Sequence, residues 1–228
     1  MFWFGDYTII LLLPVLALAF YAQHLVKSNY NKFKKYANSS GLSGAEVART
    51  ILQKNGLNGI QVEPVQGTLS DHYDPRSRVV HLSEEIYSGR SISAASIAAH
   101  EVGHALQHAS QYVPLSLRSS IFPVANFGSK AALPLFLAGF IFQTSFLMDI
   151  GIWLFGGALL FHLVTLPVEL NASHRAIKQL QDGSLVIADD ELAGSKKVLR
   201  AAALTYVAST LMALVQFLRL IILRGARE

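Results

Sequence analysis

The chain contains no cysteine. Disulfide bonds, thiolate metal ligands and thiol catalysis are therefore excluded, and any metal site must be built from His, Asp or Glu side chains. Charged residues are also few, at 15% of the chain, whereas 52% of the residues are hydrophobic. This composition is typical of a membrane protein.

The sequence also lacks the pattern of a nucleic-acid-binding protein. The net charge is +4, but the Lys and Arg residues flank apolar blocks and do not alternate with aromatic residues in a cluster. Flanking positive charge is what the ends of membrane spans carry. We therefore expect a lipid bilayer around the protein and no nucleic-acid partner.

Long apolar blocks are what the sequence does contain. A helix needs about 20 apolar residues to cross a hydrocarbon layer of about 30 Å. The first block has no Lys, Arg, Asp or Glu, and the next two are separated by a predicted turn around Asp149 and Gly151. We expect three transmembrane helices and a fourth that spans or packs in the membrane, at residues 7–26, 124–148, 150–168 and 201–223.

Charge placement predicts the orientation of these helices. No Lys or Arg precedes the first block, whereas Lys27, Lys32, Lys34 and Lys35 follow it. This order argues against a cleaved signal peptide, and by the positive-inside rule we expect the N-terminus outside and residues 27–119 in the cytoplasm. Residues 169–200 return to the cytoplasmic side. A complete fourth span conflicts with the rule, because the arginines near the C-terminus would then lie outside.

The polar stretch between the first two blocks predicts one small folded part. Ser43 to Asn55 has the capping pattern of a helix, with Ser43 as the N-cap and Glu46 at the third position. Gly59 to Val65 and Arg78 to Leu82 alternate like strands, and Asp71 to Pro75 is predicted to be a turn. Two strands before a metal-binding helix form an edge suited to an extended substrate.

The motif His100-Glu101-Val102-Gly103-His104 lies in a predicted helix at residues 93–109, which the serines at 91 and 93 could cap. His100 and His104 are one turn apart on the same face, so both imidazoles can reach one ion. Glu101 lies about 60° of arc from His104, where a general base for water would be placed. Gly103 within the helix indicates that another chain segment packs closely against it.

A catalytic zinc usually has three protein ligands, so one more is required. Ser110 occupies the position where a metzincin has its third His, and His108 lies about 12 Å along the helix axis from His100. Glu169, at the end of the third apolar block, is the better candidate. Spacing alone equally allows Glu169 to mark a helix end and pair with Arg175 or Lys178.

Four stretches of the chain together resemble the bacterial membrane zinc metallopeptidases typified by YugP. These stretches run over Leu69 to Pro75, Val79 to Ser83, Ala98 to Gln107 and Leu166 to Ala176. The family is similar in plan to the HtpX-like membrane proteases, whose third ligand comes from a Glu-x-x-Ala-Asp segment. Glu169 to Ala172 matches that segment, but Ser173 stands in place of the Asp.

The resemblance implies a mainly α-helical membrane protein with a small zincin-like, gluzincin-type cytoplasmic part in the bacterial inner membrane. His100, His104 and Glu169 would hold one zinc ion, and Glu101 would be the general base of a metalloendopeptidase acting on polypeptides. The departure at Ser173 questions the hydrogen bond that an Asp would make. Tyr73, His72 and Arg175 are candidates for the oxyanion or substrate contact.

Two other functions remain open at this point. In a site-2-type intramembrane protease the motif would lie within a span, and an Asp such as Asp182 in a second span would complete the site. In a membrane scaffold or chaperone-like protein the zinc would be structural, and such sites are normally closed by four protein ligands.

Overall fold

The computed structural model describes residues 7–183, 185–186 and 188–226, which divide into two compact units. The helical unit consists of the described residues of 1–22, 114–167 and 205–228. The mixed unit consists of those of 23–113 and 168–204. Four long helices contribute residues to both units, although one of them contributes only Val113 to the mixed unit.

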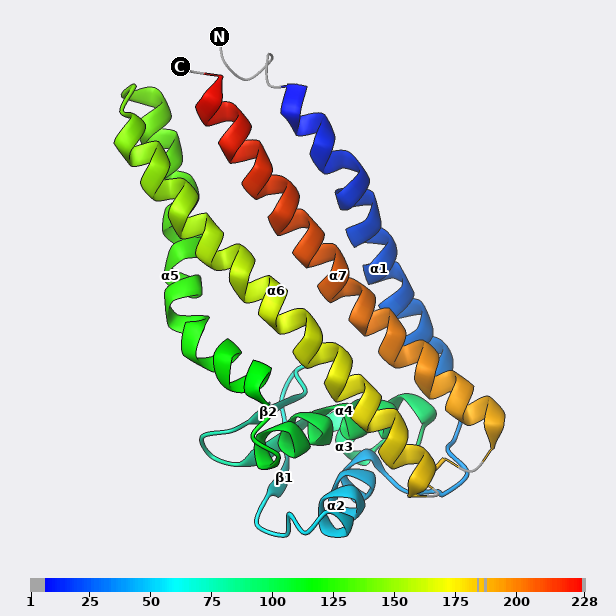
Figure 1. Ribbon diagram of the computed structural model, residues 1–228. Helices are drawn as coiled ribbons and strands as arrows, with labels where there is room; N and C mark the ends of the chain where they lie inside the picture. The colour runs from blue at the N-terminus through cyan, green and yellow to red at the C-terminus, as the bar shows by residue number, and fades with distance from the viewer. Residues whose placement is uncertain (1–6, 184, 187, 227–228) are drawn as a thin grey trace. The chain divides into compact units, whose positions relative to one another are not determined.

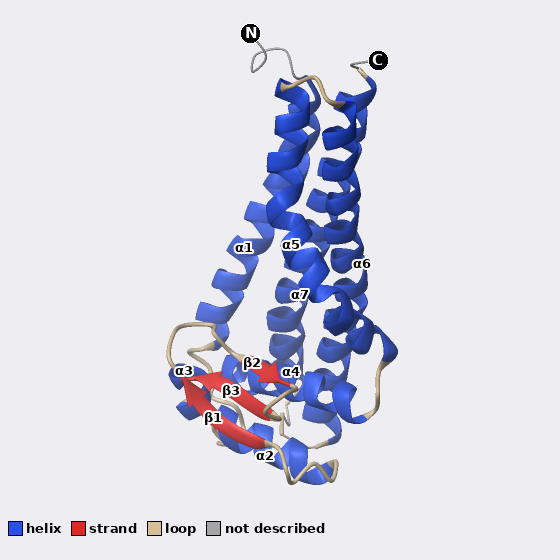
Figure 2. Cartoon of the chain, turned by 90° about the vertical axis from the view of Figure 1, so that its left-hand side faces the viewer, coloured by secondary structure: helices blue, strands red, loops and turns tan. Residues whose placement is uncertain are grey.

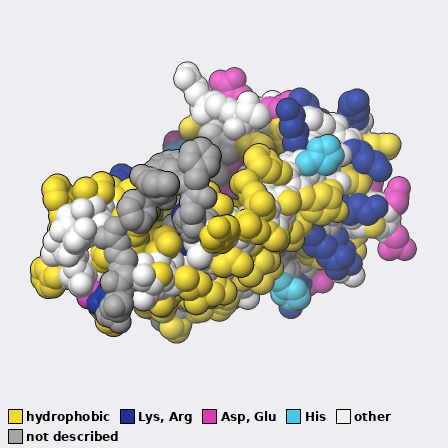
Figure 3. All heavy atoms as spheres, turned by 90° about the horizontal axis from the view of Figure 1, so that it is seen from above, with side chains coloured by type: hydrophobic (Ala, Val, Ile, Leu, Met, Phe, Trp, Pro, Cys, Tyr) yellow, Lys and Arg dark blue, Asp and Glu magenta, His cyan; other side chains and the backbone are white. Residues whose placement is uncertain are grey.

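Long helices form the helical unit (Figure 1). Four segments of the described chain are long and apolar enough to cross a membrane, so the fourth predicted segment qualifies with the other three. Hydrophobic side chains are exposed over much of the face in Figure 3, as a lipid surrounding requires. The helices are η1 (Tyr7–Leu11), α1 (Leu12–Phe33), α5 (Val113–Ile141), α6 (Ser145–Asp182) and α7 (Asp189–Gly225).

The predicted turn around Asp149 and Gly151 is wrong, because both residues lie inside α6. The chain reverses at residues 142–144, where Gln143 adopts a left-handed φ of 58°. Gly151 serves close packing instead: a Cβ atom there would lie 2.7 Å from the Ala132 carbonyl oxygen of α5. A glycine that lets two helices approach was therefore interpreted as a turn residue.

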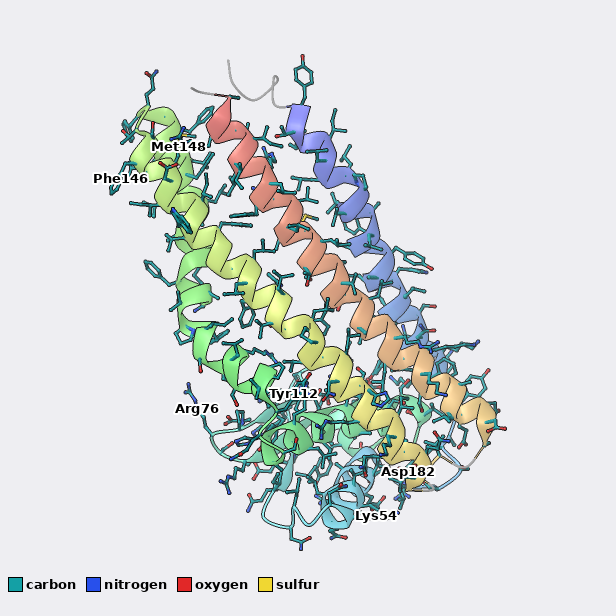
Figure 4. The ribbon with its side chains drawn as sticks, viewed as in Figure 1. Lys54, Arg76, Tyr112, Phe146, Met148 and Asp182 are labelled. Atoms are coloured by element: carbon teal, nitrogen blue, oxygen red, sulfur yellow. The ribbon has the colours of Figure 1, made fainter. Side chains whose placement is uncertain are left out.

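The start of α6 and the end of α7 pack within the helical unit. Figure 4 shows Phe146 pointing away from the helices, whereas Met148 is buried with Phe136 and Leu220. Arg224 Nε donates to Asp149 Oδ1 at 2.9 Å. This pair neutralises Arg224, one of the two arginines whose positions opposed a fourth span; the other, Arg227, lies outside the described residues.

The mixed unit contains a three-stranded sheet (Figure 2) and the three helices that lie between α1 and α5 in sequence. The strand order is β1-β3-β2, with β1 parallel and β2 antiparallel to β3. Pro64 is tolerated in β1 because this is an edge strand. The elements are α2 (Gly44–Lys54), β1 (Gln61–Val65), β2 (His72–Asp74), β3 (Val79–Ser83), α3 (Glu84–Ser88) and α4 (Ile92–Ala109).

Local capping signals predicted α2 and α4 of this unit, whereas the short α3 was not predicted. Ser43 and Glu46 form the reciprocal capping box of α2, and the Ser91 hydroxyl accepts from Ala94 N at the start of α4. The predicted turn at Asp71 to Pro75 is wrong at its beginning, because residues 72–74 form β2. The turn starts at Asp74, whose carboxylate accepts from the Arg76 backbone N–H. Tyr73 pairs with the buried Val80, which extends the sheet by three residues.

Candidate metal centre

Helix α4 presents the two histidines of the motif on one face. It is buried along most of its length, with Ala95, Ala98 and Val102 at 0–1% exposure. The His100 and His104 rings stand edge to face, with centroids 4.9 Å apart. Their spacing of one helical turn produces this arrangement, because residues four positions apart share a helix face.

A close approach of backbones brings the third residue to these histidines. A Cβ atom on Gly103 would lie 2.6 Å from the Ala172 carbonyl oxygen of α6, so α6 can take this position only against a glycine. Ala172 is itself fully buried. The expected close contact at Gly103 is therefore present. It places the segment of α6 around Ala172 beside the motif.

Glu169 lies directly beside both histidines. Its Oε2 atom is 3.3 Å from His100 Nε2 and 3.4 Å from His104 Nε2. All three potential ligand atoms lie within 4.8 Å of one another. Ligands bound about 2.0–2.2 Å from a tetrahedral zinc ion are separated by about 3.3–3.6 Å, so the donor types and the two short distances fit zinc.

Each histidine has a hydrogen-bond partner on its other ring nitrogen. Ser173 Oγ lies 3.2 Å from His100 Nδ1, and Gln107 Oε1 lies 3.1 Å from His104 Nδ1. The Glu-x-x-Ala-Asp pattern has an Asp at position 173, and its replacement by Ser put the hydrogen bond of that Asp in question. In the structure the Ser173 hydroxyl makes a contact with a histidine of the motif. Such contacts orient the imidazoles so that both Nε2 atoms face Glu169.

Glu101 is 8% exposed and follows His100 on the helix. Burial raises the pKa of its carboxyl to about 7, and the nearby negative charges of Asp71 and Glu169 act in the same direction. The positive charge on His100 opposes this effect. A carboxyl group in this position can accept or hold a proton near neutral pH.

The three predicted contact residues have partners of their own. Tyr73 on β2 is half-buried, and its hydroxyl lies 2.8 Å from His108 Nδ1, one turn beyond His104. His72 is exposed and stacks on His81. A positive charge on its ring would lower the pKa of Glu101. Arg175 Nε donates to Asn171 Oδ1 at 2.8 Å, and its guanidinium lies over the ring of Tyr112.

Sequence reasoning missed Gln107, Asn171 and Asp71. Gln107 stands three residues after His104, a spacing at which helical side chains meet, so this signal was available. The contacts of Asn171 with Gln107 and of Asp71 with Ser83 gave no comparable signal, because these partners are distant in sequence. Asp71 accepts from Ser83 N at 2.8 Å, and burial raises the pKa of its carboxyl.

The arrangement weakens both alternative functions. Helix α4 is not among the candidate spans found in the described residues, and Asp182 is exposed at the end of α6 (Figure 4). An intramembrane protease would need the motif on α4 and the aspartate to lie within the membrane. A closed structural site would need a fourth ligand, whereas the candidate cluster found in the described chain has three members.

Comparisons with known proteins agree with this geometry. A family model described as "Putative neutral zinc metallopeptidase" matches residues 8–225. The "Putative membrane protease YugP" of Bacillus subtilis (strain 168) is 54% identical over 222 residues, which cover 96% of this chain and 98% of that protein. No solved structure gives a significant match. The chain therefore belongs to the YugP-type family of zinc metallopeptidases.

Proposed function

We propose that this protein is a membrane-bound zinc endopeptidase that hydrolyses peptide bonds of membrane-associated or misfolded polypeptides. The observation that carries the proposal is the convergence of His100, His104 and Glu169, with Glu101 buried beside them. These three side chains would hold one zinc ion. When bound, zinc lowers the pKa of water and polarises a carbonyl group.

Glu101 is the residue that moves the proton in this proposal. Its carboxylate takes a proton from the attacking water and then gives it to the nitrogen of the leaving amine. Glu169 has the other role, because its Oε2 faces both histidine Nε2 atoms. Glu169 is therefore assigned as the ligand, which leaves the role of base to Glu101.

The oxyanion that forms at the peptide carbonyl needs a hydrogen-bond donor. We place Tyr73 first among the three candidates, because its hydroxyl reaches the same face of α4 that carries His100 and His104, through His108. Replacing Tyr73 by Phe, His72 by Asn and Arg175 by Gln identifies the donor. Loss of the true donor lowers kcat while the zinc content and KM remain near their original values.

The edge of the sheet supports a polypeptide substrate. In the described chain β2 pairs with β3 alone, which leaves its other edge available to an extended strand. Four apolar helices support attachment to a membrane. We further propose an inner-membrane location, with the N-terminus outside and the site on the cytoplasmic side, because the lysines follow the first span.

Hydrolysis of an unfolded protein by purified, zinc-loaded protein tests the function. We expect cleavage by the original chain and a loss of at least about 10²-fold in Glu101→Gln, the low end for removing a general base. Both proteins are matched for metal content, and Gln179→Met serves as a control away from the cluster. Equal rates, or no cleavage by either protein despite bound zinc, would favour the scaffold function.

A further inference from the structure

Gln107 is a polar side chain at 0% exposure, one helical turn beyond His104. Its amide has three partners. Nε2 lies 2.8 Å from the Val168 carbonyl oxygen and 3.0 Å from Asn171 Oδ1, and Oε1 lies 3.1 Å from His104 Nδ1. A buried amide with satisfied donors and acceptor is held in a single orientation.

The direction of each hydrogen bond follows from the Val168 carbonyl. A backbone carbonyl oxygen only accepts, so the atom of Gln107 that faces it must be the NH2 group. The oxygen of the same amide therefore faces His104 Nδ1, and because this oxygen only accepts, Nδ1 must carry the proton. Whenever the His104 ring is neutral, this tautomer leaves the lone pair on Nε2, the atom that lies beside Glu169.

The same side chain also holds the segment that carries Glu169. Val168 immediately precedes this residue, and Asn171 lies two positions after it. Asn171 Oδ1 receives a second hydrogen bond from Arg175 Nε, which fixes its acceptor side toward Gln107. Gln107 thus connects one candidate ligand on α4 with the backbone beside another on α6.

We propose that Gln107 is a positioning residue, which fixes His104 in the Nδ1-protonated form and holds Glu169 beside it. The inference rests on the proposed zinc site and deepens it. A histidine whose proton is held on Nδ1 can bind the ion through Nε2 without moving a proton between its ring nitrogens. No carboxylate is needed behind His104 for this purpose.

Two measurements on the full-length protein in detergent test the proposal. Long-range ¹H–¹⁵N spectra of the zinc-free, [¹⁵N]histidine-labelled protein report which ring nitrogen carries the proton, and His104→Gln assigns the signals. We expect Nδ1 of His104 to be protonated in the original chain. Chelator competition then gives the zinc Kd, which we expect Gln107→Met to raise about 10- to 100-fold.

Matched variants separate positioning from a structural role. Gln107→Met should leave His104 as a mixture of tautomers, whereas Gln107→Glu keeps an accepting oxygen and should keep Nδ1 protonated. Gln179→Met makes the same replacement on α6 and should change neither measurement. An original chain in which His104 Nδ1 carries no proton overturns the proposal, and this result needs no variant to fold.

Failure of the Gln107 inference can also be distinguished from failure of the proposed peptidase function. A Gln107→Met protein with an unchanged tautomer and a zinc Kd within twofold of the original would overturn the inference even if the peptidase activity is established. Conversely, an original chain that binds zinc but cleaves nothing would refute the peptidase. The spectra of the zinc-free protein and the Kd comparison would still decide the role of Gln107.

Discussion

The hydrogen-bond partners behind the two histidines are an amide and a hydroxyl. Gln107 and Ser173 orient His104 and His100 without adding negative charge. A carboxylate in either place would make the imidazole a stronger electron donor to a metal ion. At the residue scale the site is therefore oriented by neutral groups, and its negative charge comes from Glu169 and the neighbouring carboxyl groups.

Replacing Ser173 tests this view of His100. Ser173→Ala removes the oxygen that lies 3.2 Å from Nδ1, and we expect the zinc Kd to rise about tenfold, at the low end for such partners. Ser173→Asp should bind zinc more tightly than Ser173→Ala, because a carboxylate restores the contact. Chelator competition measures both values. Ser88→Ala, on an exposed serine of α3, is the control; equal Kd values for all four proteins would contradict the prediction.

Sequence alone predicted the site residues that lie on a single helix, because the helix fixes their relative positions. His100, Glu101 and His104 follow from their spacing, because any regular helix places them on adjoining faces. Spacing alone left Glu169 undecided between a ligand and an ion-pair partner of Arg175 or Lys178, since nothing local fixes its direction, and only the family resemblance favoured the ligand. In the structure Oε2 of Glu169 lies beside both histidines, and Arg175 donates to Asn171.

At the scale of elements, the contact between α4 and α6 determines where Glu169 lies. The contact has no room for a side chain at Gly103, because the Ala172 backbone occupies that space. Gly costs about 1 kcal/mol of helix stability compared with Ala, so α4 keeps it against local preference. The predictions that failed concern elements too: the α5–α6 reversal and β2 are set by packing partners that local patterns do not reveal.

Gly103→Ala should therefore destabilise the protein even though alanine favours a helix. A Cβ atom 2.6 Å from a backbone oxygen forces α6 away, and overpacking of this kind costs about 1–3 kcal/mol. We expect a lower unfolding temperature and a weaker zinc affinity together, because Glu169 moves with α6. Gly157→Ala, at a helical glycine with open space around it, is the control. A Gly103→Ala protein as stable as that control would show that the contact is not tight.

At the scale of the whole molecule, the proposed four spans would place the two ends of the described chain on the same side of a membrane. The lysines after the first helix predict that this side is the outside. Arg224 opposes that orientation by charge alone, but its pairing with Asp149 reduces the cost of placing it there. The orientation also decides which proteins could reach the β2 edge.

The absence of cysteine makes this orientation directly measurable, because each introduced cysteine is the only thiol in the chain. Ser145→Cys lies at the start of α6, and Ser88→Cys lies at the end of α3; both serines are exposed and nearly isosteric with cysteine. A membrane-impermeant maleimide should label Ser145→Cys in intact cells, but Ser88→Cys only after permeabilisation. The original chain, which has no thiol, gives the background. Reversed labelling would place the candidate metal centre outside the cell and exclude cytoplasmic polypeptides as its substrates, because only chains on the outer side would then reach the open edge of β2.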